Sequence, residues 1–251
     1  MTATVLLPSG YDLVALDEVD STNEEAKRRA IAGAREGTLV WARRQTAGRG
    51  RRGRAWTSEP GNLFASLILR PACSPAKAAE LTFVAANAAL DVVGESVLPD
   101  QVVQAKWPND VLIEGRKVAG ILLESSTAQN GKLDWLVVGI GINVLHHPEG
   151  TEFPATSLRA SGSTATVEMT LETLVRYFAH GKAIWEEQGF AAVRETWLRR
   201  ASGLGQPIRV RLPQESIEGT FAGLDASGAL ILDMGAQRRR ITAGDVFPAA
   251  A

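Results

Sequence analysis

The chain carries the stretch Gly48-Arg49-Gly50-Arg51-Arg52-Gly53-Arg54-Ala55-Trp56, in which four arginines and three glycines fill the first seven positions. Glycine lets a backbone wrap closely around a ligand, and each guanidinium offers a planar fork of donors that suits a carboxylate or a phosphate. From Trp41 to Ser58 the sequence adds Arg43 and Arg44 and has no acidic residue that could neutralise this charge. We therefore predict that this arginine loop (residues 48–56) encloses an anion, and that repulsion keeps it mobile until a negative ligand binds. Taken alone, the loop could also be a solvated turn or a contact for nucleic acid or an acidic protein.

The composition of the 251-residue chain narrows the class of protein. A hydrophobic content of 45% and this length allow one large domain, or a large and a small one. The net charge of −1 indicates that the basic loop is local, which disfavours a general nucleic-acid binder. The single cysteine, Cys73, excludes an intrachain disulfide framework and a paired-cysteine zinc site. No secretory leader opens the sequence and no apolar run reaches about 18 residues, so we expect a soluble cytoplasmic protein without membrane contact.

Apolar periodicity around the arginine loop predicts a mixed α/β domain. A helix should begin at 20–25, where Thr22 and Glu25 have the capping-box spacing, and end at Gly33. A long buried helix should follow Ser74-Pro75 as far as about Val93, and two more should meet at Gly189. The expected strands are 13–19, 38–43, 62–70, 102–106, 117–124 and 135–144, and the last two helices are 170–188 and 190–200.

The texture of the sequence changes after residue 203. Short strands alternate with turns at even spacing, which predicts a small β-barrel and a domain boundary near this point, giving domains of 1–203 and 204–251. The expected strands are 208–212, 217–224, 229–234 and 239–242.

Two further motifs, at 106–110 and 116–124, lie at the end of one predicted strand and within another. Lys106-Trp107-Pro108-Asn109-Asp110 presents a cation for a phosphate beside a carboxylate for Mg²⁺ or an amine, although Pro-Asn-Asp is also ordinary turn chemistry. In residues 116–124 Lys117 opens an apolar strand, and the small Ala119 and Gly120 leave room for a flat ligand against the sheet.

The glycines of the segment 137–144 could let a nucleotide approach the backbone. The segment is not a dinucleotide fingerprint, because the third glycine is absent at Val144. The sequence has no P-loop, HExxH or GxSxG pattern. His146 and His147 fit a loop better than a metal site, Cys73 fits an inert thiol, and 238–240 fits a solvated strand edge.

Taken in order, Ser21-Thr22-Asn23, Gln45-Thr46-Ala47 with the arginine loop, and the segments 106–110, 116–124 and 139–144 resemble the biotin protein ligases. The resemblance runs from about residue 13 to the C-terminus. It implies a mixed-sheet catalytic domain like that of class II aminoacyl-tRNA synthetases, followed by an SH3-like β-barrel. Such enzymes join biotin to ATP as biotinyl-5′-AMP and pass the biotinyl group to a lysine of a biotin carboxyl carrier domain, as in acetyl-CoA carboxylase. A basic mobile loop would offset charge repulsion and shield the mixed anhydride from water.

The resemblance also implies roles for individual residues. Biotin would be bound by Ser21, Thr22, Asn23, Gln45, Arg49, Gly50, Arg51 and Lys117. The nucleotide would be bound by Arg49, Arg51, Trp56, Lys106, Asn109 and Asn143, with Asp110 or Asn143 toward Mg²⁺. The catalytic set is Arg49, Lys117, Lys106 and Asp110, and Asp110 as the base for the acceptor lysine is our own hypothesis. Arg43, Arg44, Arg52 and Arg54 are expected only to support the loop or face solvent.

Three expectations concern partners and rivals. Bifunctional ligases carry a helix-turn-helix domain, whereas only 20 residues precede Ser21 here, so DNA binding is not expected. Family members often dimerise through the sheet, and a homodimer is an expectation on that ground alone. Lipoate or octanoate ligases are the nearest rival class, but their sequences lack the arginine loop. A nucleic-acid-binding module is disfavoured by the net charge and because no aromatic residue lies between the arginines of the loop.

Overall fold

The computed structural model describes residues 5–129 and 131–249. Its larger sheet has seven strands in the order β1-β2-β3-β7-β6-β5-β4. Strands β1 and β2 run parallel because helix α1 (Thr22–Ile31) crosses between them, and every other neighbouring pair is antiparallel. The strand bounds are β1 Asp12–Val19, β2 Thr38–Gln45, β3 Leu63–Leu69, β4 Val103–Lys106, β5 Asp110–Ile113, β6 Arg116–Thr127 and β7 Leu133–Ile142.

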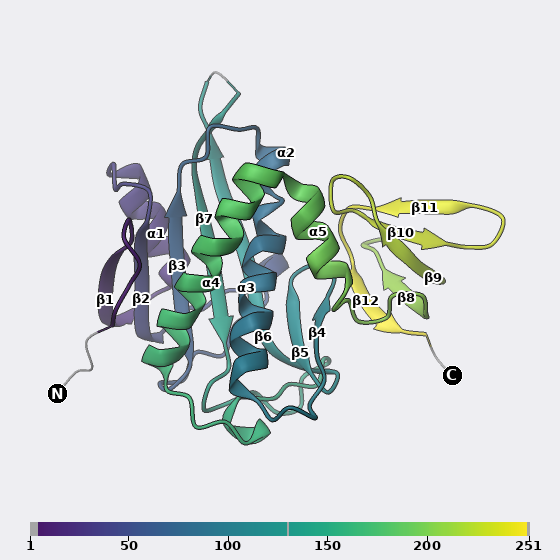
Figure 1. Cartoon of the computed structure of the whole chain (residues 1–251), viewed down its shortest axis with the longest axis horizontal. Helices are drawn as coiled ribbons and strands as arrows, with labels where there is room; N and C mark the ends of the chain where they lie inside the picture. The colour runs from purple at the N-terminus through teal and green to yellow at the C-terminus, as the bar shows by residue number, and fades with distance from the viewer. Residues whose placement is uncertain (1–4, 130, 250–251) are drawn as a thin grey trace.

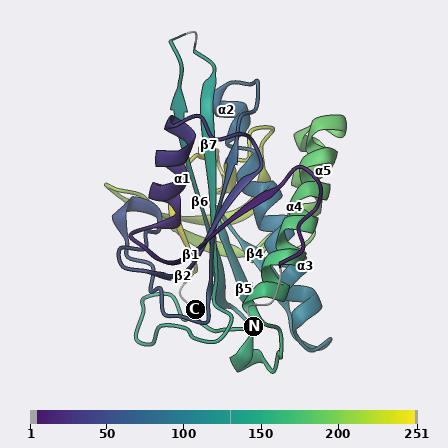
Figure 2. The same cartoon turned by 90° about the vertical axis from the view of Figure 1, so that its left-hand side faces the viewer.

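Helices cover the two faces of this sheet unequally (Figures 1 and 2). The long helices α3 (Leu81–Ser96) and α4 (Val167–Gln188) lie on one face, followed by α5 (Phe190–Leu198), whereas α1 covers only part of the other. Alternation along β3 and β7 sends one set of apolar side chains into the α3–α4 core and the other, including Ile68 and Val137, against α1. The uncovered part of the α1 face is where the site lies. No helix in the described ranges is long and apolar enough to span a membrane.

The C-terminal part forms a separate antiparallel sheet in the order β11-β10-β9-β8-β12. It lies beside β4 and α5 at one end of the large sheet (Figure 1). Trp107 Nε1 donates to Gly228 O at 3.0 Å, which ties the two parts together. The bounds are β8 Pro207–Arg211, β9 Ser216–Leu224, β10 Leu230–Asp233, β11 Arg238–Ile241 and β12 Asp245–Pro248. The expected α/β class with a C-terminal all-β part is confirmed.

The structure corrects several details of the expected elements. Strands β5 and β12 were missed; each has only four residues, and β5 lies between two turns. The helix after Ser74 is interrupted at 79–80 into α2 (Pro75–Ala78) and α3, although Ser74 Oγ does accept from Lys77 N at 3.3 Å as an N-cap. The capping box was wrong, since Ser21 is the N-cap of α1 and no side chain caps it.

Candidate active site

A pocket of about 350 Å³ lies on the uncovered part of the α1 face. Its floor comes from β3, β6 and β7, one wall from the N-terminus of α1, and its roof from the arginine loop, while β12 of the C-terminal sheet contributes Asp245 and Val246. All the residues expected at the site line this one pocket: Ser21, Thr22, Asn23, Gln45, Arg49, Gly50, Arg51, Trp56, Lys106, Asn109, Asp110, Lys117 and Asn143.

Glycines hollow out the floor of the pocket. A Cβ on Gly139 would lie 2.0 Å from Asn23 Oδ1, and one on Gly141 would lie 2.7 Å from the indole of Trp56. Gly120 pairs with Gly141 in the β6–β7 ladder, and its Cβ would meet the same indole at 3.0 Å. The flat group that lies over Gly120 and Gly141 is therefore Trp56 of the chain itself. This corrects the expectation that Ala119 and Gly120 both leave room for a ligand, since Ala119 is fully buried in the α3–α4 core.

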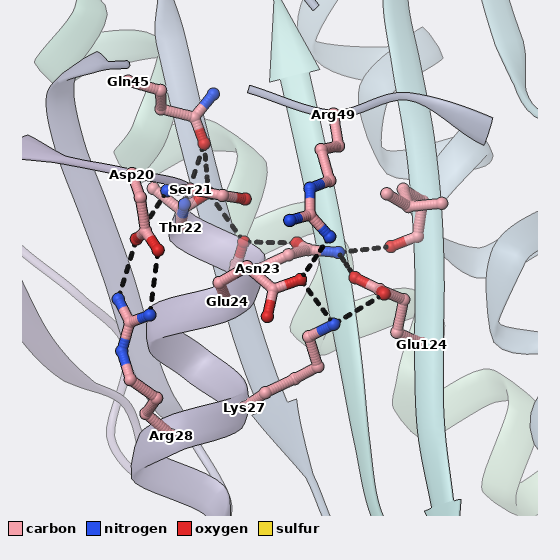
Figure 3. Close-up of polar contacts among 12 residues, drawn as sticks. Asp20, Ser21, Thr22, Asn23, Glu24, Lys27, Arg28, Gln45, Arg49 and Glu124 are labelled. Atoms are coloured by element: carbon pink, nitrogen blue, oxygen red, sulfur yellow. Dashed lines mark hydrogen bonds and ion pairs between the residues drawn. The ribbon is translucent and has the colours of Figure 1, made fainter. Parts of the chain in front are cut away.

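The end of the pocket at α1 is a connected set of neutral hydrogen-bonding groups (Figure 3). Gln45 Oε1 accepts from the backbone N of Thr22 at 2.8 Å and from its hydroxyl at 3.1 Å. Ser66 Oγ lies 2.6 Å from Asn23 Oδ1, and Asn23 Nδ2 donates to Glu124 Oε2 at 2.8 Å. These contacts fix the two amide groups in a mostly buried setting, which is how a protein pre-organises donors and acceptors for a small polar ring.

Arg49 points toward α1. Its Nη1 lies 2.8 Å from Glu24 Oε1, and Lys27 bridges Glu24 and Glu124 at 2.7 Å to each (Figure 3). Arg49 thus borders the pocket while its guanidinium is paired with a carboxylate.

Two other arginines of the loop, and Arg44 just before it, pair with carboxylates that lie far away in the sequence. Arg44 pairs with Glu18 at 2.8 Å, and Asp245 receives both Arg54 at 2.6 Å and Arg52 at 3.3 Å. The expectation of unneutralised charge was wrong, because carboxylates remote in sequence lie close in space.

The other end of the pocket is cationic. Lys117 Nζ lies 2.6 Å from Asp110 Oδ1, and Arg51 Nη1 donates to Asn109 Oδ1 at 3.1 Å. Lys106 Nζ lies 3.7 Å from the centre of the Phe153 ring. Burial lowers the pKa of Arg51, and burial lowers the pKa of Lys106 to about 8. Three cations thus face one carboxylate, which leaves an excess of positive charge suited to phosphates.

Lys106, whose pKa is lowered, is expected to make anion binding at the cationic end sensitive to alkaline pH. Its ammonium loses its proton near pH 8 instead of near the ordinary 10.5, so its positive charge fades as pH rises through about 8. We expect the KM for ATP to rise over that interval, and Lys106→Arg to shift the rise to higher pH because a guanidinium stays charged. Initial rates against ATP concentration between about pH 7 and 10 measure this. A wild-type KM that does not change across that range would contradict it.

Asn143 and Asp110 were the two residues expected toward a metal. Asn143 is 3% exposed and its Nδ2 donates to Thr156 O at 3.0 Å, so the nitrogen of its amide is committed to the protein. Within the described ranges no group of three or more His, Cys, Asp or Glu side chains could hold a metal. Mg²⁺ that accompanies a nucleotide is commonly held by phosphates, water and one or two carboxylates, and Asp110 fits that limited role.

Sequence reasoning gave no role to three residues that shape the pocket. Ser66 is a single hydroxyl on an apolar strand, and Glu124 is the last residue of the segment 116–124. Asp245 lies 191 residues from Arg54 in the sequence. A polar residue on a strand with no polar neighbours was the only signal for Ser66. Nothing local pointed to Asp245.

Comparisons with known proteins agree over nearly the whole chain. Residues 16–143 match the biotin/lipoate A/B protein ligase family, and residues 203–247 match the biotin protein ligase C terminal domain. A biotin--[acetyl-CoA-carboxylase] ligase of Paracoccus denitrificans is 43% identical over 92% of this chain and 98% of that protein. The bifunctional ligase/repressor BirA of Bacillus subtilis is 35% identical over 94% of this chain and 74% of that protein. A biotin protein ligase from Aquifex aeolicus, solved with biotin and ATP, aligns with a TM-score of 0.79 at 29% identity, covering 94% and 97% of the two chains.

The chain belongs to the biotin/lipoate A/B protein ligase family. Within that family it groups with the biotin protein ligases, whose C-terminal domain it shares.

Proposed function

We propose that this chain is a ligase that activates biotin with ATP and transfers the biotinyl group to a lysine of a biotin carboxyl carrier domain. The biotin carboxylate attacks the α-phosphorus of ATP, and pyrophosphate leaves with the electrons of the broken bond. The amine of the carrier lysine then attacks the acyl carbon, loses a proton, and expels AMP. The observation that carries the proposal is a single pocket with a neutral hydrogen-bonding end and a cationic end, roofed by the arginine loop.

The neutral end suits the ureido ring, which has two N–H donors and one carbonyl acceptor. Gln45 supplies an amide and Thr22 a hydroxyl, and Ser21 and Asn23 complete that end. Gly139 makes room for the amide of Asn23 and Gly141 for the ring of Trp56, so both side chains lie close against the sheet at this part of the pocket.

The cationic end suits the reacting carboxylate and the phosphates. Lys117 lies between Asp110 and the face of Trp56, whose ring centre is 5.3 Å from its Nζ, so its ammonium has a fixed position. Two anions must meet for adenylation, and preorganised cations stabilise the charge that builds up in that transition state. The rest of this end is lined by Lys106, Asn109, Arg51, Arg49 and Gly50. Trp56 and Asn143 are proposed to face the nucleotide.

Mg²⁺ is proposed to accompany ATP, with Asp110 as the protein carboxylate that faces it. When bound, the ion would neutralise phosphate charge. Lys117, Lys106 and Arg51 supply the fixed positive charge of the site independently of it.

Asp110 is also proposed as the base that receives the proton of the carrier lysine. It lies at the pocket with only 14% of its side chain exposed, beside Lys117. We expect Asp110→Asn to slow transfer from preformed biotinyl-5′-AMP by roughly 10²-fold, as for loss of a general base. Single-turnover transfer to a carrier domain measures the step. A transfer rate equal to that of the unaltered protein would exclude Asp110 from this role.

Incorporation of labelled biotin into a carrier domain tests the proposed function. We expect incorporation that requires ATP, and none when lipoate or octanoate replaces biotin. Incorporation of lipoate in place of biotin would support the rival ligase class. Salt-sensitive binding of DNA or RNA without incorporation would support the nucleic-acid-binding alternative.

The two domains are proposed as residues 1–203 for catalysis and residues 204–251 for the C-terminal barrel. The proposal is supported by the change of sheet after α5 and by the C-terminal family match that begins at residue 203. A proposed homodimer would use the sheet, in which β1 is an edge strand. Sedimentation of the protein with and without biotin and ATP tests it, and a monomer under both conditions would exclude it.

A further inference from the structure

The C-terminal sheet reaches the arginine loop through one carboxylate. Asp245, at the start of β12, has only 10% of its side chain exposed. Its Oδ2 accepts from Arg54 Nη2 at 2.6 Å and from Arg52 Nη1 at 3.3 Å. These arginines follow Arg51 by one and three residues. Arg51 is the loop residue whose side chain turns into the pocket toward Asn109.

The acceptor is fixed within the C-terminal sheet before it meets the loop. Asp245 lies opposite Arg211 in the β8–β12 ladder, and Arg211 Nη2 donates to Asp245 Oδ2 at 3.2 Å. Arg211 is held in turn by Glu152 at 2.9 Å. Burial raises the pKa of Asp245, but the hydrogen bonds from Arg54 and Arg211 outweigh it and leave the pKa below its ordinary value. The carboxylate is therefore charged at neutral pH.

The backbone of the loop needs such an anchor. Arg52 has φ 56° and ψ 32°, the left-handed region, which costs a residue with a side chain about 1 kcal/mol or more and persists only where its surroundings hold it. Two contacts close the loop around it, since Gly50 N donates to Arg54 O at 2.7 Å and Arg54 N to Arg51 O at 3.2 Å. Holding Arg52 and Arg54 therefore also holds Arg51.

A second contact brings the two parts together at the same place. Phe153 stacks on Phe247 of β12 with ring centres 4.9 Å apart, and the Arg54 guanidinium lies 5.8 Å from the Phe153 ring centre. Arg54 thus pairs with Asp245 of the C-terminal sheet and also packs on Phe153, the ring that stacks against that sheet through Phe247.

We propose that Asp245 is a positioning residue that anchors the tip of the arginine loop to the C-terminal sheet, so that the loop retains the acyl-adenylate in the pocket. This rests on the proposed function for the identity of the retained ligand. The anchor itself does not depend on that identity. The C-terminal sheet is then a structural part of the roof of the pocket.

Tryptic cleavage of the full-length protein without ligands tests the anchor. Trypsin cuts after arginine, so release of the loop should expose Arg49, Arg51, Arg52 and Arg54. In Asp245→Asn we expect cleavage within residues 48–56, mapped by mass spectrometry, to be about tenfold faster, as for loss of one charge-assisted hydrogen bond. Glu215→Gln is the matched control, because Glu215 pairs with Arg239 in the C-terminal sheet at 2.6 Å and touches no loop residue in the described ranges.

Retention of biotinyl-5′-AMP tests the consequence. After adenylation without acceptor, Asp245→Asn should release the adenylate about tenfold faster and label lysines of bystander proteins. The combined Arg52→Ala and Arg54→Ala variant should do the same with the C-terminal sheet unaltered, and it covers the case in which Asp245→Asn unfolds. Loop cleavage in Asp245→Asn at the rate of the unaltered protein, or adenylate release at that rate in either variant, would overturn the proposal. If the unaltered protein forms no adenylate, the proposed function fails, and cleavage of the loop still decides whether Asp245 anchors it.

Discussion

Lys117→Met should lower biotin-dependent ATP–pyrophosphate exchange by about 10²–10³-fold, the usual effect of removing one preorganised donor from a transition state. Lys117 Nζ lies 2.6 Å from Asp110 and near the Trp56 ring, so its charge is held at the point where we propose that the carboxylate and the α-phosphate meet. Methionine is unbranched and one atom shorter, and it removes the positive charge together with its N–H donors. Steady-state exchange of labelled pyrophosphate into ATP measures the loss.

Loss of stability must be separated from loss of chemistry in that experiment. Removing Lys117 leaves Asp110, which is 14% exposed, without its paired cation, and breaking a mostly buried pair is destabilising. The double variant Lys117→Met with Asp110→Asn removes both charges and should recover the thermal midpoint but not the exchange rate. Lys77→Met, on α2, is a control for the substitution itself and should leave exchange unchanged. Exchange that returns with the thermal midpoint would show that Lys117 acts only on stability.

Gly139→Ala should raise the KM for biotin by about 10²-fold, because a shift of about 1 Å in a positioning group can cost that much. The new Cβ would lie 2.0 Å from Asn23 Oδ1, and Asn23 cannot yield freely because Ser66 and Glu124 hold its two amide atoms. Overpacking of this kind also costs about 1–3 kcal/mol of stability. Rates against biotin concentration, taken well below the melting temperature, measure the effect on binding.

The matched control is Gly94→Ala. Gly94 lies within α3, and a Cβ there would meet nothing within 4 Å. The same substitution should therefore stabilise the protein by roughly 0.5–1 kcal/mol and leave the KM for biotin unchanged. Equal KM values for the two variants would remove Gly139 and Asn23 from the biotin end of the pocket.

Local patterns predicted the elements of the fold well where strands were long or turns distinct. Alternation predicted β1, a short strand was also expected where β2 lies, and Gly189 separated α4 from α5 as expected. Strand β5 escaped because its four residues lie between two turn motifs, so the turn signals outweighed the strand signal. The break between α2 and α3 was hidden, because alanine and leucine on both sides favour helix equally.

The motifs predicted many of the residues that line the pocket, but not which of these residues contact one another. The ordered motifs brought residues from Ser21 to Asn143 into one pocket. The motifs could not say that Trp56 covers Gly120 and Gly141, or that Asp245 receives Arg52 and Arg54. Those contacts join segments far apart in the chain, and only the packing of the two sheets determines them.

We propose that this pocket makes an acyl-adenylate and holds it before any acceptor binds. The most direct measurement is to incubate the protein with biotin and ATP alone, remove free ligands by rapid gel filtration, and identify the bound species by mass spectrometry. We expect biotinyl-5′-AMP in amounts close to those of the chain, consumed when a carrier domain is added, and absent with Lys117→Met. Recovery of unreacted biotin and ATP, or the same adenylate yield from Lys117→Met, would contradict the account.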